Sequence, residues 1–221
     1  MIKAAIYDLD DLMINSEPLH QESWRVLVER HGGDFDLFTE EIHSSFIGKR
    51  ISEIVPRMIE IFSLEMSYDQ AWKERHQILY ELVEQGLELM PGLKKSLKFF
   101  RKKGLKVAIA SSGTSHWIET ILGKFKLHKY FDEIVSSDHV KNGKPHPEPY
   151  LLAAKRLGLK PKECVVLEDA TNGILSAKAA GCFCIAVKNS NTPPQNLCQA
   201  DIILDSLKQV DLTVFSRLKT S

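Results

Sequence analysis

Short apolar runs alternate with helical patterns along most of the chain. Residues 2–7 form the first run, which predicts a strand buried on both faces. Apolar residues recur at helical spacing in several later segments, and these alternate with further apolar runs. The segments predicted as helices are 93–103, 115–125, 148–157 and 173–180, and the runs predicted as strands are 106–110, 133–136, 164–167, 184–187 and 202–204. This alternation predicts an α/β fold with a three-layer, Rossmann-like, mostly parallel sheet.

The stretch that follows the first strand has a different pattern. From residue 15 to about residue 85 the apolar residues keep helical spacing, and no segment has the pattern of a strand. Asn15, Ser16 and Pro18 form a helix start, in which Asn or Ser caps the helix and Pro occupies its first turn. We therefore expect a helical cap domain over 15–87, inserted into a core made of 1–14 and 88–221.

Composition and charge exclude several classes of partner. The chain has 221 residues, and its 29 basic and 29 acidic residues cancel, which leaves no net field to hold nucleic acid or an acidic membrane surface. No apolar stretch is long enough to span a bilayer, and the amino terminus lacks the regions of a signal peptide. We expect a cytoplasmic monomer with no nucleic-acid or membrane partner. The four cysteines lack the paired spacing of zinc sites, so we expect buried free thiols.

Carboxylates follow directly after the first predicted strand. Asp8, Asp10 and Asp11 stand where the apolar run ends, and in an open α/β sheet ligands bind at the carboxyl ends of the strands. Asp8 and Asp10 are two residues apart, so in an extended chain their side chains point the same way and repel each other. A positive group is therefore expected nearby. The alternative is an acidic surface turn, since Asp is a common turn residue.

Polar groups of complementary kinds mark three other strand or loop ends. Ser111 and Ser112 follow one predicted strand, Lys144 lies in a loop before a helix, and Glu168 with Asp169 follows another strand. Each has an ordinary explanation as a turn, a surface lysine or a helix cap. Because all of them fall at one edge of a parallel sheet, we expect them to share a single pocket with the first carboxylates.

This set of groups is suited to phosphoryl transfer. Two acidic pairs at one edge are stable together only if a proton or a multivalent cation joins them. Mg²⁺ prefers oxygen ligands and commonly bridges carboxylates to a substrate phosphate, whose other oxygens a lysine, a hydroxyl and backbone N–H groups would hold. An ionised aspartate can attack phosphorus and form an acyl phosphate, while a second carboxyl protonates the departing oxygen. The sequence therefore predicts a Mg²⁺-dependent enzyme that transfers a phosphoryl group from a small phosphate ester.

Four motifs, taken together and in this order, resemble those of the haloacid dehalogenase superfamily. They are Asp8-Leu9-Asp10, the run 107–110 that ends at Ser111, Gly143-Lys144-Pro145, and Glu168-Asp169 within the run 165–173. The resemblance covers essentially the whole chain. It is to the phosphatase branch with a helical cap, which includes the β-phosphoglucomutase-like enzymes.

The resemblance implies a role for each motif residue. It implies that Asp8 is the nucleophile, that Asp10 is the general acid and base, and that the Ser111 hydroxyl binds phosphate. Apart from the resemblance, we expect backbone N–H groups at the helix start at Ser112 to add phosphate donors. It implies further that Lys144 neutralises the nucleophile and the phosphate. In that family Mg²⁺ is held by the nucleophile, by the backbone carbonyl of the second Asp and by the acid of the fourth motif. Carried over to this chain, the metal ligands are Asp8, Asp10 and Asp169, with Glu168 as an auxiliary.

The chain departs from the family pattern at two positions. Members of this branch usually have Gly directly after the second Asp, where this chain has Asp11. A positive φ there would strain the backbone, although Asp tolerates left-handed geometry better than most residues. Asn15 replaces the Asp that typically precedes Ser16, and since both residues cap helices well we expect little effect.

The resemblance also gives the predicted cap a role and suggests which residues select the substrate. A cap that closes over the strand ends would exclude water and contact the leaving group. The candidates are His20 near the hinge, Lys49 and Arg50 after Gly48, and His116 from the core. Arg50 stands at a Gly-x-Arg position that often faces substrate in similar caps. Each candidate has the alternative of an ordinary surface or packing role.

The leading hypothesis is a phosphatase that acts on a sugar phosphate or a nucleoside monophosphate through a phosphoaspartate on Asp8. A hexose phosphate mutase of the β-phosphoglucomutase kind is the close alternative, and a non-catalytic protein that binds a phosphometabolite is another, to which Asp11 is the only pointer. A dehalogenase would need neither Asp10 as acid nor the metal acids at 168 and 169. A phosphorylated receiver module would lack the helical insertion.

Overall fold

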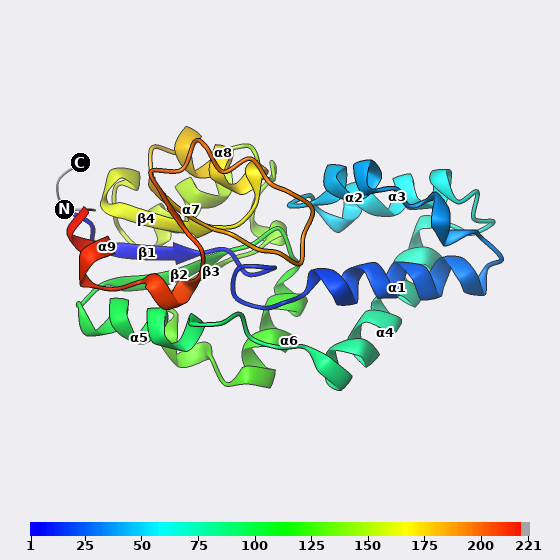
Figure 1. Ribbon diagram of the computed structural model, residues 1–221, viewed down its shortest axis with the longest axis horizontal. Coiled ribbons are helices and arrows are strands. Elements are labelled where there is room, and N and C mark those ends of the chain that lie inside the picture. The colour runs from blue at the N-terminus through cyan, green and yellow to red at the C-terminus, as the bar shows by residue number, and fades with distance from the viewer. Residues whose placement is uncertain (218–221) are drawn as a thin grey trace.

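A single six-stranded sheet forms the centre of the core domain in the computed structural model, which describes residues 1–217 (Figure 1). The strand order is β3-β2-β1-β4-β5-β6, and every described strand pair is parallel. The strands are β1 (Ala4–Tyr7), β2 (Lys106–Ala110), β3 (Glu133–Val135), β4 (Cys164–Glu168), β5 (Phe183–Val187) and β6 (Ile202–Leu204). The predicted α/β fold is confirmed, and the sheet is parallel throughout rather than mostly parallel.

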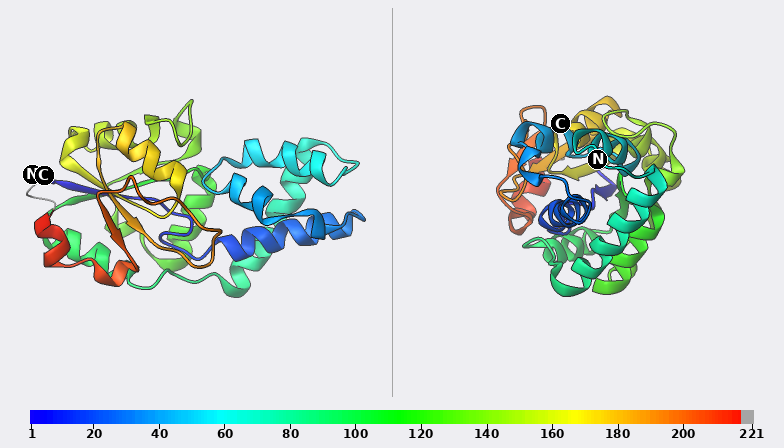
Figure 2. Two further views of the ribbon diagram at one scale, coloured as in Figure 1. Left: turned by 45° about the horizontal axis from the view of Figure 1, so that its top comes forward. Right: turned by 90° about the vertical axis from the view of Figure 1, so that its right-hand side faces the viewer.

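Helices cover both faces of this sheet, which confirms the three layers (Figure 2). Ala5 and Tyr7 of β1 face one cluster of buried residues, while Ala4 and Ile6 face the other, as expected for a strand buried on both faces. The first cluster includes α5 (Leu93–Lys102), α6 (Ser115–Phe125) and α9 (Leu212–Arg217); the second includes α7 (Glu148–Arg156) and α8 (Thr171–Ala179). Short 3₁₀ helices lie at η1 (Phe35–Leu37), η2 (His128–Tyr130), η3 (Ser137–His139), η4 (Pro161–Glu163) and η5 (Leu207–Gln209).

The helical stretch forms a separate layer beyond the carboxyl edge of the sheet (Figures 1 and 2). It contains α1 (Glu17–Arg30), α2 (Glu40–Phe46), α3 (Ile51–Ile61) and α4 (Tyr68–Gly86), and none of its described residues lies in a strand. Trp24, Val28 and Met58 belong to a buried cluster of its own. The two segments that join it to the core pair with each other, since Asn15 N donates to Glu88 O at 2.9 Å. The boundaries at 14/15 and 87/88 stay a prediction.

The start of α1 differs from the expected cap. Pro18 lies in its first turn, as predicted, but Ser16 at the N-cap position makes no side-chain capping bond. The backbone N–H groups of Ser16 and Glu17 donate instead to Asp11 Oδ1, at 3.1 and 2.8 Å. Asp11 has φ +61°, the left-handed geometry that glycine usually provides at this position. The prediction of an Asn or Ser cap is therefore wrong, because a carboxylate from the preceding loop takes that place.

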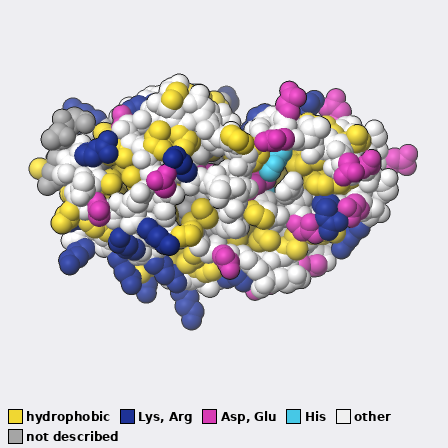
Figure 3. All heavy atoms as spheres, in the orientation of Figure 1, with side chains coloured by type: hydrophobic (Ala, Val, Ile, Leu, Met, Phe, Trp, Pro, Cys, Tyr) yellow, Lys and Arg dark blue, Asp and Glu magenta, His cyan; other side chains and the backbone are white. Residues whose placement is uncertain are grey.

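Charge is unevenly distributed despite the zero net charge. Figure 3 shows Lys and Arg side chains gathered over α5, whose exposed basic residues are Lys94, Lys95, Lys98, Arg101 and Lys102. Of the four predicted buried thiols, three are buried and free, and Cys198 is free but exposed, so the prediction is wrong for that residue. Within residues 1–217, none of the helices combines the length and the apolar character needed to cross a membrane.

Candidate active site

The carboxyl ends of three neighbouring strands bring the predicted groups to one place. β1 lies between β2 and β4, and Tyr7 is in register with Ile109 on one side and Leu167 on the other. Asp8 directly follows β1, Ser111 directly follows β2, and Glu168 is the last residue of β4. The parallel register therefore sets these side chains at the same edge, where neighbouring connections diverge.

Lys144 links two of these carboxylates. Its Nζ lies 2.5 Å from Asp8 Oδ1 and 2.6 Å from Glu168 Oε1. Glu168 is held by other donors as well: the Tyr150 hydroxyl donates to Oε1 at 2.5 Å, and the backbone N–H of Asp169 donates to Oε2 at 3.1 Å. The positive group expected beside the first aspartates is present, and a fixed glutamate holds it there.

Glycine is required behind this glutamate. A Cβ on Gly173 in α8 would lie 1.8 Å from Glu168 Oε1, so any larger residue there would displace the carboxylate. Because α8 begins directly after the Glu168-Asp169 pair, its first turn packs against the side chain of Glu168.

Burial and mutual repulsion dominate the electrostatics of the cluster. Burial raises the pKa of Asp8 to about 8, and Lys144 lowers it only partly because the charges of Glu168 and Asp10 raise it. Burial and the neighbouring charge of Glu168 also raise the pKa of Asp169 well above its usual value. Burial alone would lower the pKa of Lys144, but Asp8 and Glu168 outweigh it and keep the ammonium charged. The ammonium of Lys144 thus lies among the carboxylates of Asp8, Glu168 and Asp169.

The residues present fit a divalent cation. Carboxylate oxygens of Asp8, Glu168 and Asp169 lie within 4.8 Å of one another. Asp169 Oδ2 is buried and has no hydrogen-bond partner among the described residues, which leaves a costly unmet acceptor. Hard oxygen donors of this kind are the ligands that Mg²⁺ prefers. The carboxylate of Asp10, the other expected metal residue, is not part of this group.

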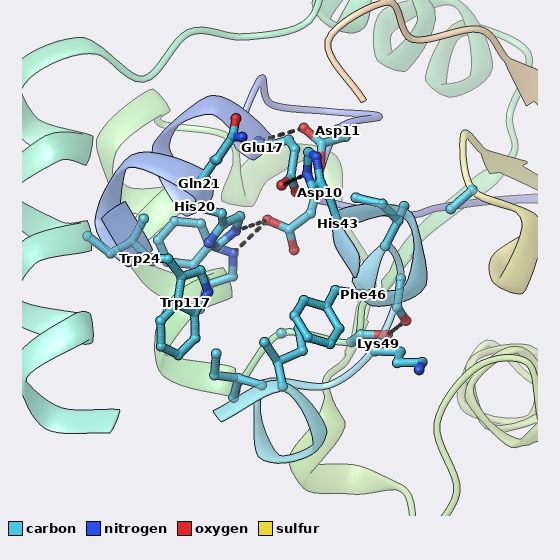
Figure 4. A pocket seen from close by; sticks show the side chains of 18 of the residues that line it. Asp10, Asp11, Glu17, His20, Gln21, Trp24, His43, Phe46, Lys49 and Trp117 are labelled. Atoms are coloured by element: carbon cyan, nitrogen blue, oxygen red, sulfur yellow. Dashed lines mark hydrogen bonds and ion pairs between the residues drawn. The ribbon is translucent and has the colours of Figure 1, made fainter. Parts of the chain in front are cut away.

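Asp10 is instead surrounded by donors. Its Oδ1 accepts from Trp117 Nε1 at 3.0 Å and lies 3.6 Å from His20 Nε2, while Ser111 Oγ lies 3.5 Å from its Oδ2 (Figure 4). Burial would raise the pKa of Asp10, but the neighbouring imidazole of His20 and the Trp117 indole outweigh it and lower the pKa. The pKa values of the two motif aspartates, Asp8 and Asp10, therefore shift in opposite directions, a pattern typical of paired carboxylates with different roles.

His20 is fixed by a residue that the sequence analysis missed. Arg75 Nη2 lies 2.5 Å from His20 Nδ1. Since a guanidinium can only donate, Nδ1 accepts and the ring hydrogen lies on Nε2, facing Asp10. Arg75 is 3% exposed and stacks over the ring of Trp24, and burial lowers its pKa to about 10. A charged residue four positions after Ala71 and four before Leu79, on the buried face of α4, is the signal that could have identified it.

A cavity lies between this cluster and the cap (Figure 4). Its lining includes His20 and, from the core, Asp8, Asp10, Lys144, Glu168 and Asp169. Glu17 of α1 and His43 of α2, whose Oε1 and Nε2 lie 2.5 Å apart, form a polar pair on the cap wall that the sequence analysis also missed. Most of the remaining cap wall is apolar, contributed by Trp24, Phe38, Phe46, Ile47, Ile51, Ile54 and Leu79.

Residues 5–187 match the family model of the haloacid dehalogenase-like hydrolases. The chain belongs to this family. The resemblance of its four motifs is thereby confirmed, and so is the expectation that it is an enzyme of the phosphatase kind.

Relatives and solved structures agree with this assignment. This haloacid dehalogenase-like hydrolase is 34% identical to the phosphorylated carbohydrates phosphatase of Thermotoga maritima over 81% of its own length and 82% of the relative's. It is 33% identical to hexitol phosphatase A of Escherichia coli, over 96% and 94% of the two chains. The structure of β-phosphoglucomutase from Clostridium difficile superposes with a TM-score of 0.85 at 25% identity, covering 100% of this chain and 98% of the other.

Two predicted binding residues of this hydrolase, Arg50 and His116, do not face the cavity in the expected way. Ser112 lines the cavity, where its hydroxyl donates to the Gly48 carbonyl of the cap at 3.1 Å, and the expected role of its backbone N–H groups stays a prediction. Arg50, expected to face substrate, donates to backbone carbonyls of the core and is absent from the described lining. His116 is exposed and packs against Tyr80. Lys49 is exposed and lines the cavity mouth, as expected of a cap candidate.

Proposed function

We propose that this hydrolase is a Mg²⁺-dependent phosphatase that cleaves the phosphate monoester of a small sugar or sugar alcohol through a phosphoaspartate on Asp8. The single observation that carries the proposal is the contact of Lys144 with both Asp8 and Glu168 beside the partnerless oxygen of Asp169. The carbohydrate phosphatases among its relatives favour a sugar ester over a nucleoside monophosphate.

The first half of the reaction uses Asp8 and its neighbours. Asp8, Asp169 and the backbone carbonyl of Asp10 would hold Mg²⁺, with Glu168 as an outer partner that fixes Lys144. When bound, the ion would supply positive charge that keeps Asp8 ionised and neutralises the phosphate. Lys144, already within hydrogen-bond distance of Asp8 Oδ1, orients that carboxylate for attack on phosphorus. Ser111 and the backbone N–H groups at residues 112–114 would complete the phosphate site.

Asp10 would donate a proton in the first half-reaction and accept one in the second. It is ionised in the substrate-free site, and an incoming phosphate would raise its pKa by like-charge repulsion, which favours the protonated form needed to protonate the leaving oxygen. Once the alcohol has left, the same carboxylate takes a proton from the water that attacks the phosphoaspartate. His20, held by Arg75, would keep Asp10 oriented through both steps.

The cap would choose the leaving group. The Glu17–His43 pair offers both an acceptor and a ring N–H to hydroxyl groups, and Trp24 and Phe46 offer apolar faces for the C–H side of a carbohydrate. Cap residues line one wall of the cavity, and closure of the cap over the ester would keep bulk water away during the first half-reaction.

Turnover of a panel of phosphate esters tests the proposal. The panel contains hexose phosphates, hexitol phosphates and nucleoside monophosphates, each with and without Mg²⁺. We expect Mg²⁺-dependent phosphate release that is fastest with the carbohydrate esters. Binding of these esters without any turnover would instead support a non-catalytic phosphometabolite-binding protein.

The close overall match to a β-phosphoglucomutase keeps a hexose phosphate mutase as the second candidate. A mutase would use the same core and return the phosphate to its sugar. Incubation with β-glucose 1-phosphate and a trace of the bisphosphate separates the two. A phosphatase releases stoichiometric phosphate, whereas a mutase yields glucose 6-phosphate without it.

A further inference from the structure

One short segment of the cap contacts three regions of the core. Residues 47–50 connect α2 to α3, and they meet the loops that carry the second and third motifs and the first turn of α8, beside the fourth motif. Ser112 Oγ donates to Gly48 O at 3.1 Å, and Asn172 Nδ2 donates to Ile47 O at 3.3 Å. Arg50 makes the third contact, with the loop that leads to Lys144.

Arg50 binds this loop through two successive carbonyl groups. Its Nη1 donates to Lys141 O at 3.0 Å, and its Nη2 donates to Val140 O at 3.1 Å. The planar guanidinium suits such a paired contact, which a lysine ammonium cannot reproduce. The partners are about 90 residues away along the chain, on a different domain.

Gly143 makes room for this guanidinium. A Cβ built on Gly143 would lie 2.6 Å from Arg50 Nε, although the backbone of Gly143 is outside the left-handed region that glycine alone adopts easily. The absence of a side chain at this position is therefore explained by the close approach of Arg50. The next residue is Lys144, whose Nζ bridges Asp8 and Glu168.

We propose that Arg50 is a positioning residue: docking of the cap places its guanidinium on residues 140–143 and so fixes the loop that presents Lys144 to Asp8. Closure of the cap and assembly of the catalytic lysine are thus one event. The kinetic consequence rests on the proposed phosphatase activity, whereas the structural coupling does not.

Hydrogen–deuterium exchange of the substrate-free protein tests the coupling directly. Arg50→Ala is compared with Arg57→Ala, a matched control on α3, the helix that follows Arg50, whose side chain is 60% exposed and pairs with Glu60. We expect Arg50→Ala to speed exchange severalfold in residues 140–147, and Arg57→Ala to leave that loop unchanged. Equal exchange of this loop in Arg50→Ala and the unmodified protein would overturn the proposal.

Kinetics then separate positioning from substrate binding. With p-nitrophenyl phosphate as probe, we expect Arg50→Ala to lower kcat by about tenfold with little change in KM, because a misplaced catalytic group costs rate rather than affinity. Arg50→Lys should recover only part of that loss. A rise in KM alone would assign Arg50 to substrate and contradict the proposal. If no ester is turned over at all, the exchange experiment still decides the coupling.

Gly143→Ala provides an independent variant that keeps the arginine. The added methyl group should displace the guanidinium and reproduce the faster exchange of residues 140–147 seen in Arg50→Ala. The double variant, with both substitutions, should exchange in this loop no faster than either single variant. Additive effects in the double variant would show that the two residues act separately, which would overturn the proposal. This variant also keeps the test valid if Arg50→Ala does not fold.

Discussion

The core wall and the cap wall of the cavity differ in the kinds of residue that form them. On the core wall the charged groups other than Asp169 have fixed partners: Lys144 contacts two carboxylates, and the two oxygens of Glu168 accept from Lys144, Tyr150 and backbone N–H groups. The cap wall is mainly apolar, with the Glu17–His43 pair as an isolated polar contact and Arg75 behind His20. We infer that hydrogen bonds within the core fix the groups proposed to carry out the chemistry, while the cap contributes shape and a few polar contacts.

The largest expected effect comes from the core wall. Asp8→Asn removes the proposed nucleophile and a metal ligand together, so phosphate release should fall by about 10⁴-fold or more. The side chain is nearly the same size, so the far-UV circular dichroism should be unchanged. Turnover by Asp8→Asn within tenfold of that of the unmodified enzyme would contradict the proposal that the core wall carries the catalytic groups.

Metal binding should depend on pH with a defined sign. The pKa of Asp8 is raised to about 8, so in the metal-free protein this group favours the folded state at low pH and loses that contribution as the pH rises toward 8. Mg²⁺ needs the deprotonated carboxylates, and its binding must release these protons. We therefore expect Mg²⁺ to raise Tm more at about pH 8 than at about pH 6. A shift that is equal at both values, with sodium salt as the control, would contradict this.

A smaller effect should follow from loss of one donor to Asp10. Trp117→Phe removes the indole N–H that helps to lower the pKa of Asp10. Because Asp10 is the acid of the half-reaction that kcat/KM reports, the alkaline limb of the pH profile of kcat/KM should move to higher pH by about one unit. An unshifted alkaline limb would mean that Asp10 does not control that limb.

The smallest expected effect, and the most selective, lies on the cap wall. Glu17→Gln weakens the pair with His43, so KM for a hexitol phosphate should rise by about fivefold while KM for p-nitrophenyl phosphate stays the same. Glu22→Gln on the same helix is the matched control, since Glu22 pairs with Arg25. Equal changes in KM for both esters would contradict the proposal that the core wall carries out the chemistry and the cap wall selects the substrate.

The sequence could predict the core wall because strand ends carry local signals. Asp8, Ser111 and Glu168 each stand at or beside the end of an apolar run, and parallel pairing then brings them together whatever the loops between them do. Lys144 lies in a loop, and the resemblance of Gly143-Lys144-Pro145 to a family motif assigned its role beside the crowded carboxylates. Asp11 was identified as unusual, but its capping of α1 depends on a loop geometry that propensities do not specify.

The cap wall was less predictable because its contacts join distant positions. Arg75 meets His20 across 55 residues, and His43 meets Glu17 across 26. The Gly-x-Arg pattern correctly drew attention to Arg50 but gave the wrong direction for its guanidinium. That direction depends on where the cap rests on the core, which no local pattern contains.

Chemical identification of the phosphorylated intermediate tests the central claim most directly. Asp10→Asn is mixed with a hexitol phosphate and Mg²⁺, quenched in acid and digested, and the peptides are examined by mass spectrometry. Since this variant lacks the base that activates water, phosphate should accumulate on the peptide that contains Asp8 and on that residue. Continued release of phosphate with no labelled peptide, or a label on any other residue, would contradict the account.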